Sequence, residues 1–524
     1  KINCQRLIEL TLNLFVFFVI SLVYFYSLTG YGKILINKSS NFFDLQIDGT
    51  IILLLTGYFL YLSIGINQAT NFLILTLGII FFFFYKKGIS TIKLKYIFIL
   101  LTCVFSVLVI SKTHEDFNTY HLFSIYEVYN NNLRLGVSKL NGYFVHSSHL
   151  ILNQGLTVIP YLNFKILHLP IFFIYFSTIG YFTSILFNKN SKSQEIFFSI
   201  LCVLILLIKF NRLSEYGYDY VAQYLLLIVF HKIFFLNHED QQLIKALIYF
   251  IFSILIKPVS LLFSPILIFI LYKKGFSFYK KITIKNYVLI SLLLVTIISS
   301  SFFKTGCLFY PLNSTCFSKD KIFWSEKSRL KDYSRTVSLW AKSYDAQNDS
   351  KYNKISDKEI FLKNFNWINV WIEKHFFYKI SEFLLIVSLL ILMIYFYFNK
   401  IKSADNQNIK EKLVIFFLSF LSIIFWLNTV PQFRFGFASI IIFLFIIFNL
   451  ILNLKIKFNK KKFIHFFIFG LLVLNLKNFN RINNEFQRDD FYKFTNFPFF
   501  NEKKINNNYS NLKRQKYLHI EILK

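Results

Sequence analysis

Residues 437–454 read FASIIIFLFIIFNLILNL, eighteen residues without a charged side chain. A helix of about 20 apolar residues crosses the hydrocarbon core of a bilayer. Comparable runs recur along the chain, separated by short polar connections. We expect spans near 7–28, 49–66, 70–85, 93–110, 165–187, 195–210, 221–236, 242–256, 259–273, 285–303, 378–398, 411–429, 437–454 and 462–476. The predicted fold class is an all-α integral membrane protein with about 12 to 14 transmembrane helices.

Composition supports this class. Hydrophobic residues make up 55% of the chain and charged residues 16%, against roughly 25% charged residues in soluble domains. The formal net charge of +31 suggests nucleic-acid binding at first sight. However, the lysines lie in short clusters between apolar runs, which is the pattern set by insertion orientation. We therefore expect an anionic lipid bilayer as their partner, and no nucleic acid.

The lysine clusters occupy alternate short connections, which places these connections in the cytoplasm. They contain Lys86, Lys87, Lys93, Lys95, Lys189, Lys192, Lys273, Lys274, Lys280, Lys281, Lys285, Lys400, Lys402, Lys410, Lys412, Lys455, Lys457, Lys460, Lys461 and Lys462. The connections between them should face outward, namely 111–164, 211–220, 304–377 and 430–436. The predicted organisation is a transmembrane bundle (1–303) with a long interfacial loop (111–164), an extracytoplasmic loop (304–377), C-terminal transmembrane helices (378–476) and a polar tail (477–524).

The first candidate site follows the fourth predicted span. Glu115 and Asp116 come directly after an apolar helix, with Tyr120 and His121 close behind. Adjacent carboxylates at a helix end can bind a divalent cation through oxygen ligands. One of them can also accept a proton from a hydroxyl nucleophile. The alternative is an ordinary solvated helix end.

The second candidate region is 132–149, inside the outward loop 111–164. It mixes aromatic and small polar residues with Arg134, Lys139 and His149. Such a mixture favours amphipathic helices at the outer interface. The three side chains can contact phosphate, for which the planar fork of arginine is suited. Alternatively, the region is an interfacial lid whose cations lie near lipid headgroups.

Three further charges lie at predicted outward helix ends. Asp219 directly precedes the span 221–236, where it can cap the helix or face the same cavity as Asp116. Arg434 lies in a very short turn without an adjacent acid, so it needs an anionic partner unless it snorkels to the surface. Lys257 precedes Pro258 between two short apolar runs, at a tight hairpin or a broken helix, where it can reach a lipid phosphate.

The loop 304–377 contains Cys307 and Cys316, nine residues apart. A disulfide between them is possible in an oxidising compartment, and two unpaired small apolar residues are the alternative. The middle of this loop is polar, and its ends are aromatic. The chain has no Walker loop, Rossmann glycine fingerprint, zinc-type Cys/His spacing or nucleophile elbow, so nucleotide-driven pumping is unsupported.

Taken together, these segments resemble the membrane-embedded glycosyltransferases of the GT-C superfamily. More narrowly, they are similar to a poorly characterised bacterial family of multi-span proteins linked to surface-polysaccharide assembly. The likeness rests on the Glu115–Asp116 loop, the stretch 134–149, the acid at Asp219, the turn 434–436 and the Cys segment 306–317. It covers most of residues 93–440. The chain departs from the usual pattern because three spans, rather than one, precede the helix that leads into the acidic loop.

The resemblance implies transfer of a sugar from a polyprenyl-phosphate-linked donor to a surface glycan or lipid acceptor. The expected location is a bacterial inner membrane, with the active side facing the periplasm or exterior. Asp116, Glu115 and Asp219 are the expected catalytic acids, and Asp116 and Glu115 the expected ligands of a divalent cation, Mg²⁺ or Mn²⁺. The expected phosphate-binding residues are Arg434, Arg134, Lys257, His149 and His121. Alternative functions are an O-antigen-type polymerase or ligase, and a lipid-linked oligosaccharide flippase or transporter.

Overall fold

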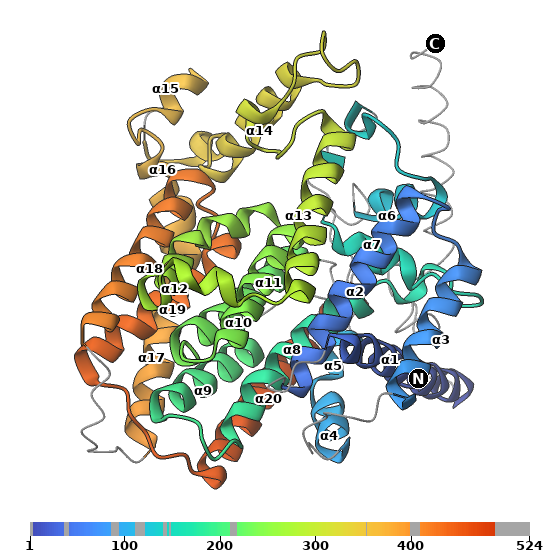
Figure 1. Ribbon diagram of the computed structural model, residues 1–524. Helices are drawn as coiled ribbons and strands as arrows, with labels where there is room; N and C mark the ends of the chain where they lie inside the picture. Colours follow the sequence, from blue (N-terminus) through green and yellow to red (C-terminus); the bar gives the residue numbers. More distant parts are fainter. Residues whose placement is uncertain are drawn as a thin grey trace.

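The computed structural model describes residues 4–35, 41–84, 94–109, 121–139, 144–145, 148–209, 217–352, 354–398 and 409–487 (Figure 1). These residues form helices joined by turns and contain no β-strand. The α-helices are α1 (Cys4–Ile34), α2 (Phe42–Leu62), α3 (Gln68–Phe84), α4 (Leu94–Val104), α5 (Ser106–Val109), α6 (Leu122–Asn130), α7 (Leu150–Leu156), α8 (Leu169–Leu186), α9 (Ser193–Ile208), α10 (Tyr218–Phe235), α11 (Asp240–Ile256), α12 (Ile268–Lys274), α13 (Ile284–Thr305), α14 (Lys327–Ala341), α15 (Lys358–Leu362), α16 (Ile368–Trp371), α17 (Ser381–Tyr397), α18 (Ile409–Thr429), α19 (Phe433–Leu452) and α20 (Lys460–Gln487). The 3-10 helices are η2 (Val137–Lys139), η4 (Phe164–Ile166), η6 (Pro258–Leu267), η7 (Phe276–Lys281), η8 (Asn313–Thr315) and η9 (Asp345–Asp349), and η10 (Ile372–Ile380) is a π-helix.

Eight helical segments among the described residues are long and apolar enough to cross a bilayer. Three shorter apolar helices lie over α3, α4–α5 and α9. The chain is therefore an all-α, multi-pass membrane protein, as the sequence predicted. Each of the fourteen predicted spans coincides largely with helical residues. The predicted count of 12 to 14 crossings exceeds the eight candidates. Several helices at the other predicted spans are too short or too polar to qualify by length and composition.

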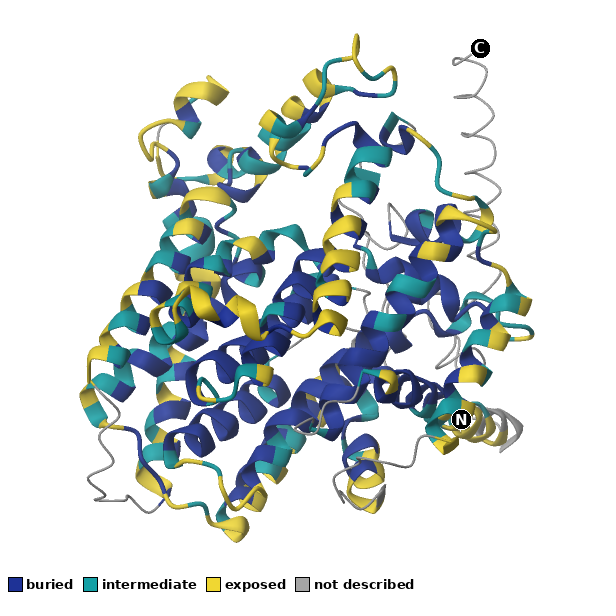
Figure 2. Ribbon diagram, viewed as in Figure 1, coloured by how far each residue is buried: buried dark blue, intermediate teal, exposed yellow. Residues whose placement is uncertain are grey.

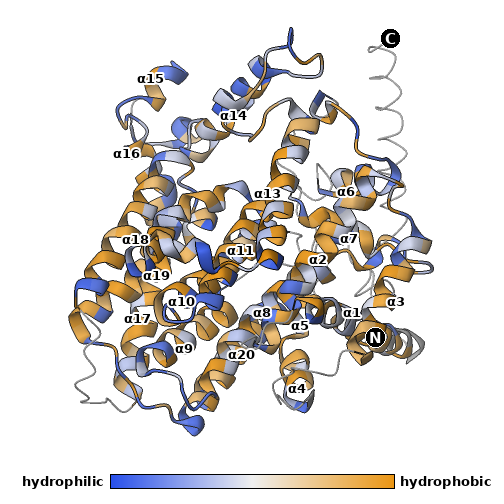
Figure 3. Cartoon of the chain, viewed as in Figure 1, coloured by the Kyte–Doolittle hydropathy of each residue, from blue (hydrophilic) through white to orange (hydrophobic). Residues whose placement is uncertain are grey.

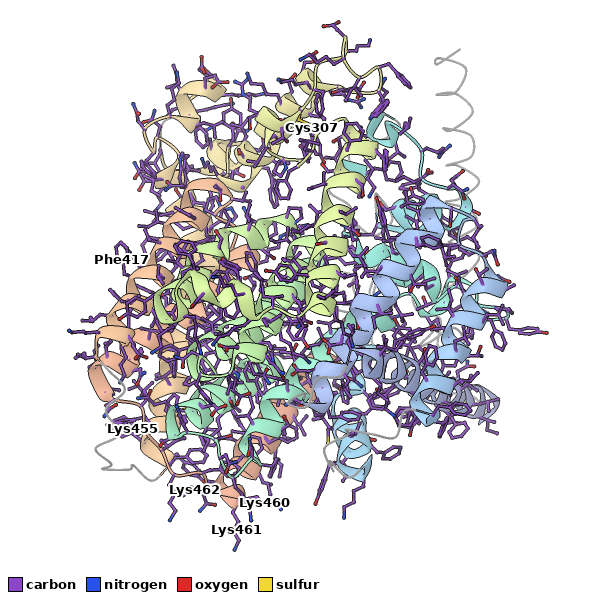
Figure 4. The ribbon with its side chains drawn as sticks, in the orientation of Figure 1. Cys307, Phe417, Lys455, Lys460, Lys461 and Lys462 are labelled. Atoms are coloured by element: carbon purple, nitrogen blue, oxygen red, sulfur yellow. A yellow bond between two sulfur atoms is a disulfide. The ribbon has the colours of Figure 1, made fainter. Side chains whose placement is uncertain are left out.

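The bundle has a fully buried centre and lipid-exposed walls. Nearly every residue of α8, α9, α10 and α11 is buried (Figure 2). By contrast, α13, α17, α18 and α20 present apolar side chains outward, as Phe417 does on α18 (Figures 3 and 4). An apolar outer surface of this extent is suited to lipid rather than water. The helices α10 and α11 carry charged residues but are buried inside the bundle, so these charges need not face the hydrocarbon.

Charge and covalent structure distinguish the two ends of the bundle. Lys455, Lys460, Lys461 and Lys462 lie at one end, here called the lysine end, and Cys307 lies at the opposite end, here called the disulfide end (Figure 4). The helices α14 to α16 form a cap over the disulfide end (Figure 1). The cap corresponds to the predicted loop 304–377, in which Cys307 and Cys316 form a disulfide.

The sequence left open whether the segment after α11 is a tight hairpin or a broken helix, and the structure combines both. The helix ends at Ile256, and the extended residue Lys257 turns the chain. The returning segment is the 3-10 helix η6 followed by α12, and η6 contains Pro265. Proline has no N–H group to donate, so Pro265 interrupts the helical hydrogen bonds of this segment. The returning segment ends at Lys274. Its Nζ atom lies 2.9 Å from Oδ1 of Asp240, the first residue of α11.

One predicted boundary and one predicted location need correction. The second span was expected to begin at residue 49, whereas α2 begins at Phe42 and takes Asp44 and Asp48 into its first two turns. Isolated charges are costly in lipid, but both aspartates have buried cationic partners here. In the loop 111–164, the predicted interfacial helices include α7, which is instead buried along its whole length against α2, α6 and α8.

Candidate functional site

Asp219 lies between two cations at the disulfide end. Its Oδ1 atom is 2.8 Å from Lys257 Nζ, and its Oδ2 atom is 3.1 Å from Arg434 Nε. The three residues come from the start of α10, the end of α11 and the start of α19. The helix α19 ends just before Lys455, so its first turn lies at the end of the bundle opposite to the lysine end. This cluster of Asp219, Lys257 and Arg434 is called the outer triad below.

Aromatic residues cover the cations of the outer triad. The Arg434 guanidinium lies 5.2 Å from the ring centroids of both Trp340 and Phe435, and Lys257 Nζ lies 5.7 Å from the Phe435 ring. These are cation–π distances. The side chains of Asp219, Lys257 and Arg434 are 12%, 20% and 28% exposed. The outer triad is therefore mostly buried but still accessible to a ligand. Trp340 belongs to the cap and is itself 44% exposed.

The outer triad has one negative and two positive charges. Two adjacent cations stabilise the ionised form of Asp219 and orient both of its oxygens. Asp219 is therefore poorly placed as a catalytic acid, the role that the sequence analysis expected for it. Its evident role is to hold Lys257 and Arg434 side by side. The excess positive charge makes the triad suited to an anion, and arginine suits phosphate in particular.

The turn before Arg434 is rigidly held. Trp371 Nε1 donates to the Pro431 carbonyl at 2.7 Å, and Trp426 Nε1 donates to the Gln432 carbonyl at 2.9 Å. A Cβ atom on Gly436 would meet the Trp426 ring at 2.6 Å, so only glycine fits there. Gln432 Nε2 in turn donates to the carbonyl of Ala341 at 3.0 Å. The cap and the membrane helices thus fix the position of Arg434 together.

The structure gives Arg134 a protein partner. Arg134 donates from Nε and Nη2 to Glu127 Oε1 at 2.9 and 2.6 Å, a paired arrangement within the loop 111–164. A guanidinium neutralised in this way is less available to phosphate than Arg434 is, because Glu127 already occupies its fork. Lys139 donates to the Phe323 carbonyl at 3.1 Å and so connects the loop to the cap.

The two predicted histidines have different surroundings. His149 Nδ1 lies 3.0 Å from the carbonyl oxygen of Leu255, two residues before Lys257. Burial, together with the nearby Lys304 ammonium, lowers the pKa of His149 to about 3. His149 is therefore neutral at physiological pH and supports the α11 hairpin instead of supplying positive charge. His121 lies at the start of α6, with its ring 4.8 Å from that of Tyr218, next to Asp219.

Glu115, Asp116 and Tyr120 lie outside the described residues, so the acid-bearing loop stays a prediction. Among the residues that the structure describes, no group of three or more His, Cys, Asp or Glu side chains could hold a metal ion. The predicted cation site at Glu115 and Asp116 is not covered by that finding.

Sequence reasoning missed a second charged cluster, near the lysine end of α2, α10 and α11. Lys232 Nζ is 3.0 Å from Asp44 Oδ2 and donates to Gln242 Oε1 at 2.7 Å. Lys245 Nζ is 3.0 Å from Asp48 Oδ2 and 3.8 Å from Asp44 Oδ2. The Tyr249 hydroxyl donates to Asp48 Oδ1 at 3.0 Å. All four charged residues are buried, and their charges balance. We call Asp44, Asp48, Lys232 and Lys245 the inner tetrad.

A neighbouring pair extends the polar interior. His231 Nε2 lies 3.0 Å from Glu195 Oε1, and His231 Nδ1 lies 2.8 Å from the Tyr181 hydroxyl. Lys232 Nζ also lies 4.9 Å from the Tyr181 ring. Five helices, α2, α8, α9, α10 and α11, therefore share one buried polar network. The signal in the sequence was the i,i+4 spacing of Asp44 and Asp48 ahead of an apolar run, with lysines inside two later runs.

These features define a polytopic α-helical membrane protein that contains a sheltered cationic site and a buried, charge-balanced network. The chain belongs to the family described as "Domain of unknown function (DUF8201)", whose family model matches residues 10–441. That region includes the outer triad and the inner tetrad. No curated protein and no solved structure matches the chain.

Proposed function

We propose that this protein is a membrane-embedded glycosyltransferase. It moves a sugar from a polyprenyl-phosphate-linked donor to a surface glycan or lipid acceptor, on the outer face of a bacterial inner membrane. The observation that carries the proposal is the outer triad, where Asp219 holds Lys257 and Arg434 beside Trp340. A phosphate-bearing lipid can reach this site sideways from the bilayer, so no nucleotide-sugar entry is needed.

The proposed reaction is a direct displacement. The acceptor hydroxyl attacks the anomeric carbon, the bond from that carbon to the phosphate oxygen breaks, and its electron pair stays on the phosphate. Lys257 and Arg434 stabilise the negative charge that develops on the leaving phosphate. Asp116 accepts the hydroxyl proton, with Glu115 beside it. A divalent cation, Mg²⁺ or Mn²⁺, would be held by these two carboxylates and would polarise the substrate oxygens. Such a displacement inverts the anomeric centre.

The direction of insertion supports an outward site. Lys455 and Lys460 to Lys462 gather at the end opposite to the outer triad, and short basic connections remain in the cytoplasm. The disulfide of Cys307 and Cys316 lies at the same end as the triad, and disulfides persist in oxidising compartments.

The test compares surface polysaccharide from a deletion strain complemented with wild type, Arg434→Gln, Lys257→Gln or Asp116→Asn. Membrane expression is matched between strains. Wild type should restore a missing sugar, and each variant should fail to do so. Full restoration of the glycan by all three variants would overturn the proposal. Arg329→Gln is the matched control, because Arg329 is exposed and pairs with Glu326 at 3.0 Å.

A flippase or transporter is the second candidate, and the inner tetrad favours it. Intramembrane charges commonly mark substrate or ion pathways. Movement of a labelled lipid across vesicles containing the purified protein, with no new glycosidic bond, would decide for this function. The polymerase or ligase alternative depends on outward arginines. Arg329 and Arg335 both have glutamate partners in the cap, the latter Glu359 at 2.9 Å, which gives that alternative no specific support.

A further inference from the structure

Three lysines from separate helices converge on the outer wall of the bundle. Lys209 follows the last residue of α9, Lys379 lies in η10 and Lys477 lies in α20. Lys477 Nζ donates to the Ile208 carbonyl at 2.6 Å, directly beside Lys209. Lys477 and Lys379 both repel the Lys209 ammonium, and Glu382 attracts it. The group of Lys209, Lys379 and Lys477 is called the basic patch below.

The basic patch lies at the membrane boundary of the disulfide end. Lys477 is seventeen residues after Lys460, which corresponds to about 25 Å along a helix, close to the thickness of the hydrocarbon core. Lys209 Nζ lies 4.6 Å from the ring of Phe433, the residue before Arg434. The patch and the outer triad are therefore at the same depth, on neighbouring sides of the first turn of α19.

The surroundings of the basic patch face lipid. Phe377, Tyr378 and Phe479 are exposed, Tyr378 by 72%, and lie next in sequence to the patch or two residues from it. Exposed aromatic side chains at the end of a membrane span are typical of the headgroup region. Lys209 itself is half-buried between the Phe383 and Phe433 rings, at 5.5 and 4.6 Å.

Lys209 has no close counter-ion within the described part of the chain. Glu382 attracts its ammonium group, but no carboxylate of the described residues lies within 4 Å of Lys209 Nζ. Lys209 is half-buried between two aromatic rings, and the nearby Lys477 ammonium adds repulsion. A half-buried cation without a close counter-ion is costly, and an anion supplied by the bilayer would offset that cost. This separates the patch from the inner tetrad, which has its counter-ions within the chain.

We propose that the basic patch binds the phosphate headgroup of an anionic glycerophospholipid, with the acyl chains lying against α17 and α20. The exposed aromatic residues beside the patch fit a bilayer lipid better than a soluble anion. Basic pockets between membrane helices are a common means of binding such headgroups. The proposal does not depend on the proposed enzymatic function, because the patch is separate from the residues of the outer triad.

The test uses the full chain in bilayer nanodiscs made of phosphatidylcholine with or without phosphatidylglycerol. Lipid that stays bound after detergent extraction is measured by native mass spectrometry. Wild type should retain phosphatidylglycerol preferentially, and Lys209→Gln and Lys477→Gln should each lower that preference roughly fivefold, as expected for one basic residue at an anionic surface. Lys209→Arg should restore the preference, which separates loss of charge from misfolding.

Lys354→Gln is the matched control, because it removes an exposed lysine of the cap that belongs to none of the predicted cytoplasmic clusters. Equal losses in Lys209→Gln and Lys354→Gln, or no loss in either, would overturn the proposal. Preferential displacement of phosphatidylglycerol by undecaprenyl phosphate at equal concentration would also overturn it, because the occupant would then be a lipid-linked substrate. Activity of the enzyme is not a readout, so the outcome is independent of the proposed reaction.

Discussion

Asp219 and Arg434 are 215 positions apart in the sequence, yet Asp219 Oδ2 lies 3.1 Å from Arg434 Nε. The contact joins the first turn of α10 to the first turn of α19. It fixes the guanidinium beneath Trp340 of the cap. The pair and Lys257 are the basis for the first two predictions.

Lys257→Gln and Arg434→Gln should each weaken binding of undecaprenyl phosphate about tenfold. Each removes one charge-assisted contact, and the other cation then remains paired with Asp219 alone. Microscale thermophoresis of the purified protein in lipid measures the affinity. Arg329→Gln should bind as wild type does. An affinity within twofold of wild type in both triad variants would show that the anion binds elsewhere.

Asp219→Asn should destabilise the protein by about 1–2 kcal/mol, because it leaves two sheltered cations without their counter-charge. The side chains are partly exposed, which limits the loss through solvent screening. Thermal unfolding of the purified protein gives the shift. In a double-mutant cycle, Asp219→Asn should cost less in a Lys257→Gln background. Strictly additive effects would rule out coupling between these residues.

Asp44→Asn should destabilise the protein by about 3–5 kcal/mol, more than any variant of the outer triad. It leaves Lys232 buried without its nearest carboxylate, and a buried uncompensated charge is costly. Folded yield and thermal unfolding measure the effect. Asp320→Asn, an exposed position in the cap, is the control. A combined Asp44→Asn and Lys232→Met variant should recover part of the loss, and no recovery would contradict the pairing.

The lowered pKa of His149 should make the free energy of unfolding depend on pH. Its pKa of about 3 in the folded protein lies below the ordinary value of 6.5, so the unfolded chain binds the extra proton between these values. The contribution of His149 is therefore complete above pH 6.5 and is lost as pH falls, at about 1.4 kcal/mol per pH unit. His149→Gln should flatten the decline in thermal stability between pH 6.5 and 4. An unchanged slope would show that other groups control it.

The two ends of the bundle should lie on opposite sides of the membrane. In intact cells, a membrane-impermeant maleimide should label Lys354→Cys in the cap and spare Lys461→Cys until the membrane is permeabilised. Both positions are exposed, so accessibility within the protein is matched. Labelling of both cysteines in intact cells would contradict the insertion direction on which the outward site depends.

Much of the fold follows from hydropathy, because each predicted span depends on a local run of apolar residues. The sequence analysis named Asp219, Lys257 and Arg434 one by one and expected Arg434 to need an anionic partner, but it did not bring the three residues together. Their assembly required knowing that α10 and α19 start at the same end and pack together, which is a non-local fact. Arg134 shows the opposite case, since its partner Glu127 lies only seven residues away but was not considered.

The inner tetrad was missed for a physical reason. A residue such as Asp44 is read as the end of a span because hydropathy treats each charge as though it faced lipid. The cost disappears only when Lys232 and Lys245 approach from two other helices. No pattern within α2 alone contains that information.

The helices α10 and α11 hold a charged partner at each of their ends, in the outer triad and in the inner tetrad. Sliding either helix by one turn, about 5.4 Å, would break ion pairs at both ends at once. The pair α10 and α11 therefore has a fixed register and should move as one rigid unit. Any movement that admits or releases a substrate must come from the helices around it, while the distance between the two charged clusters stays constant.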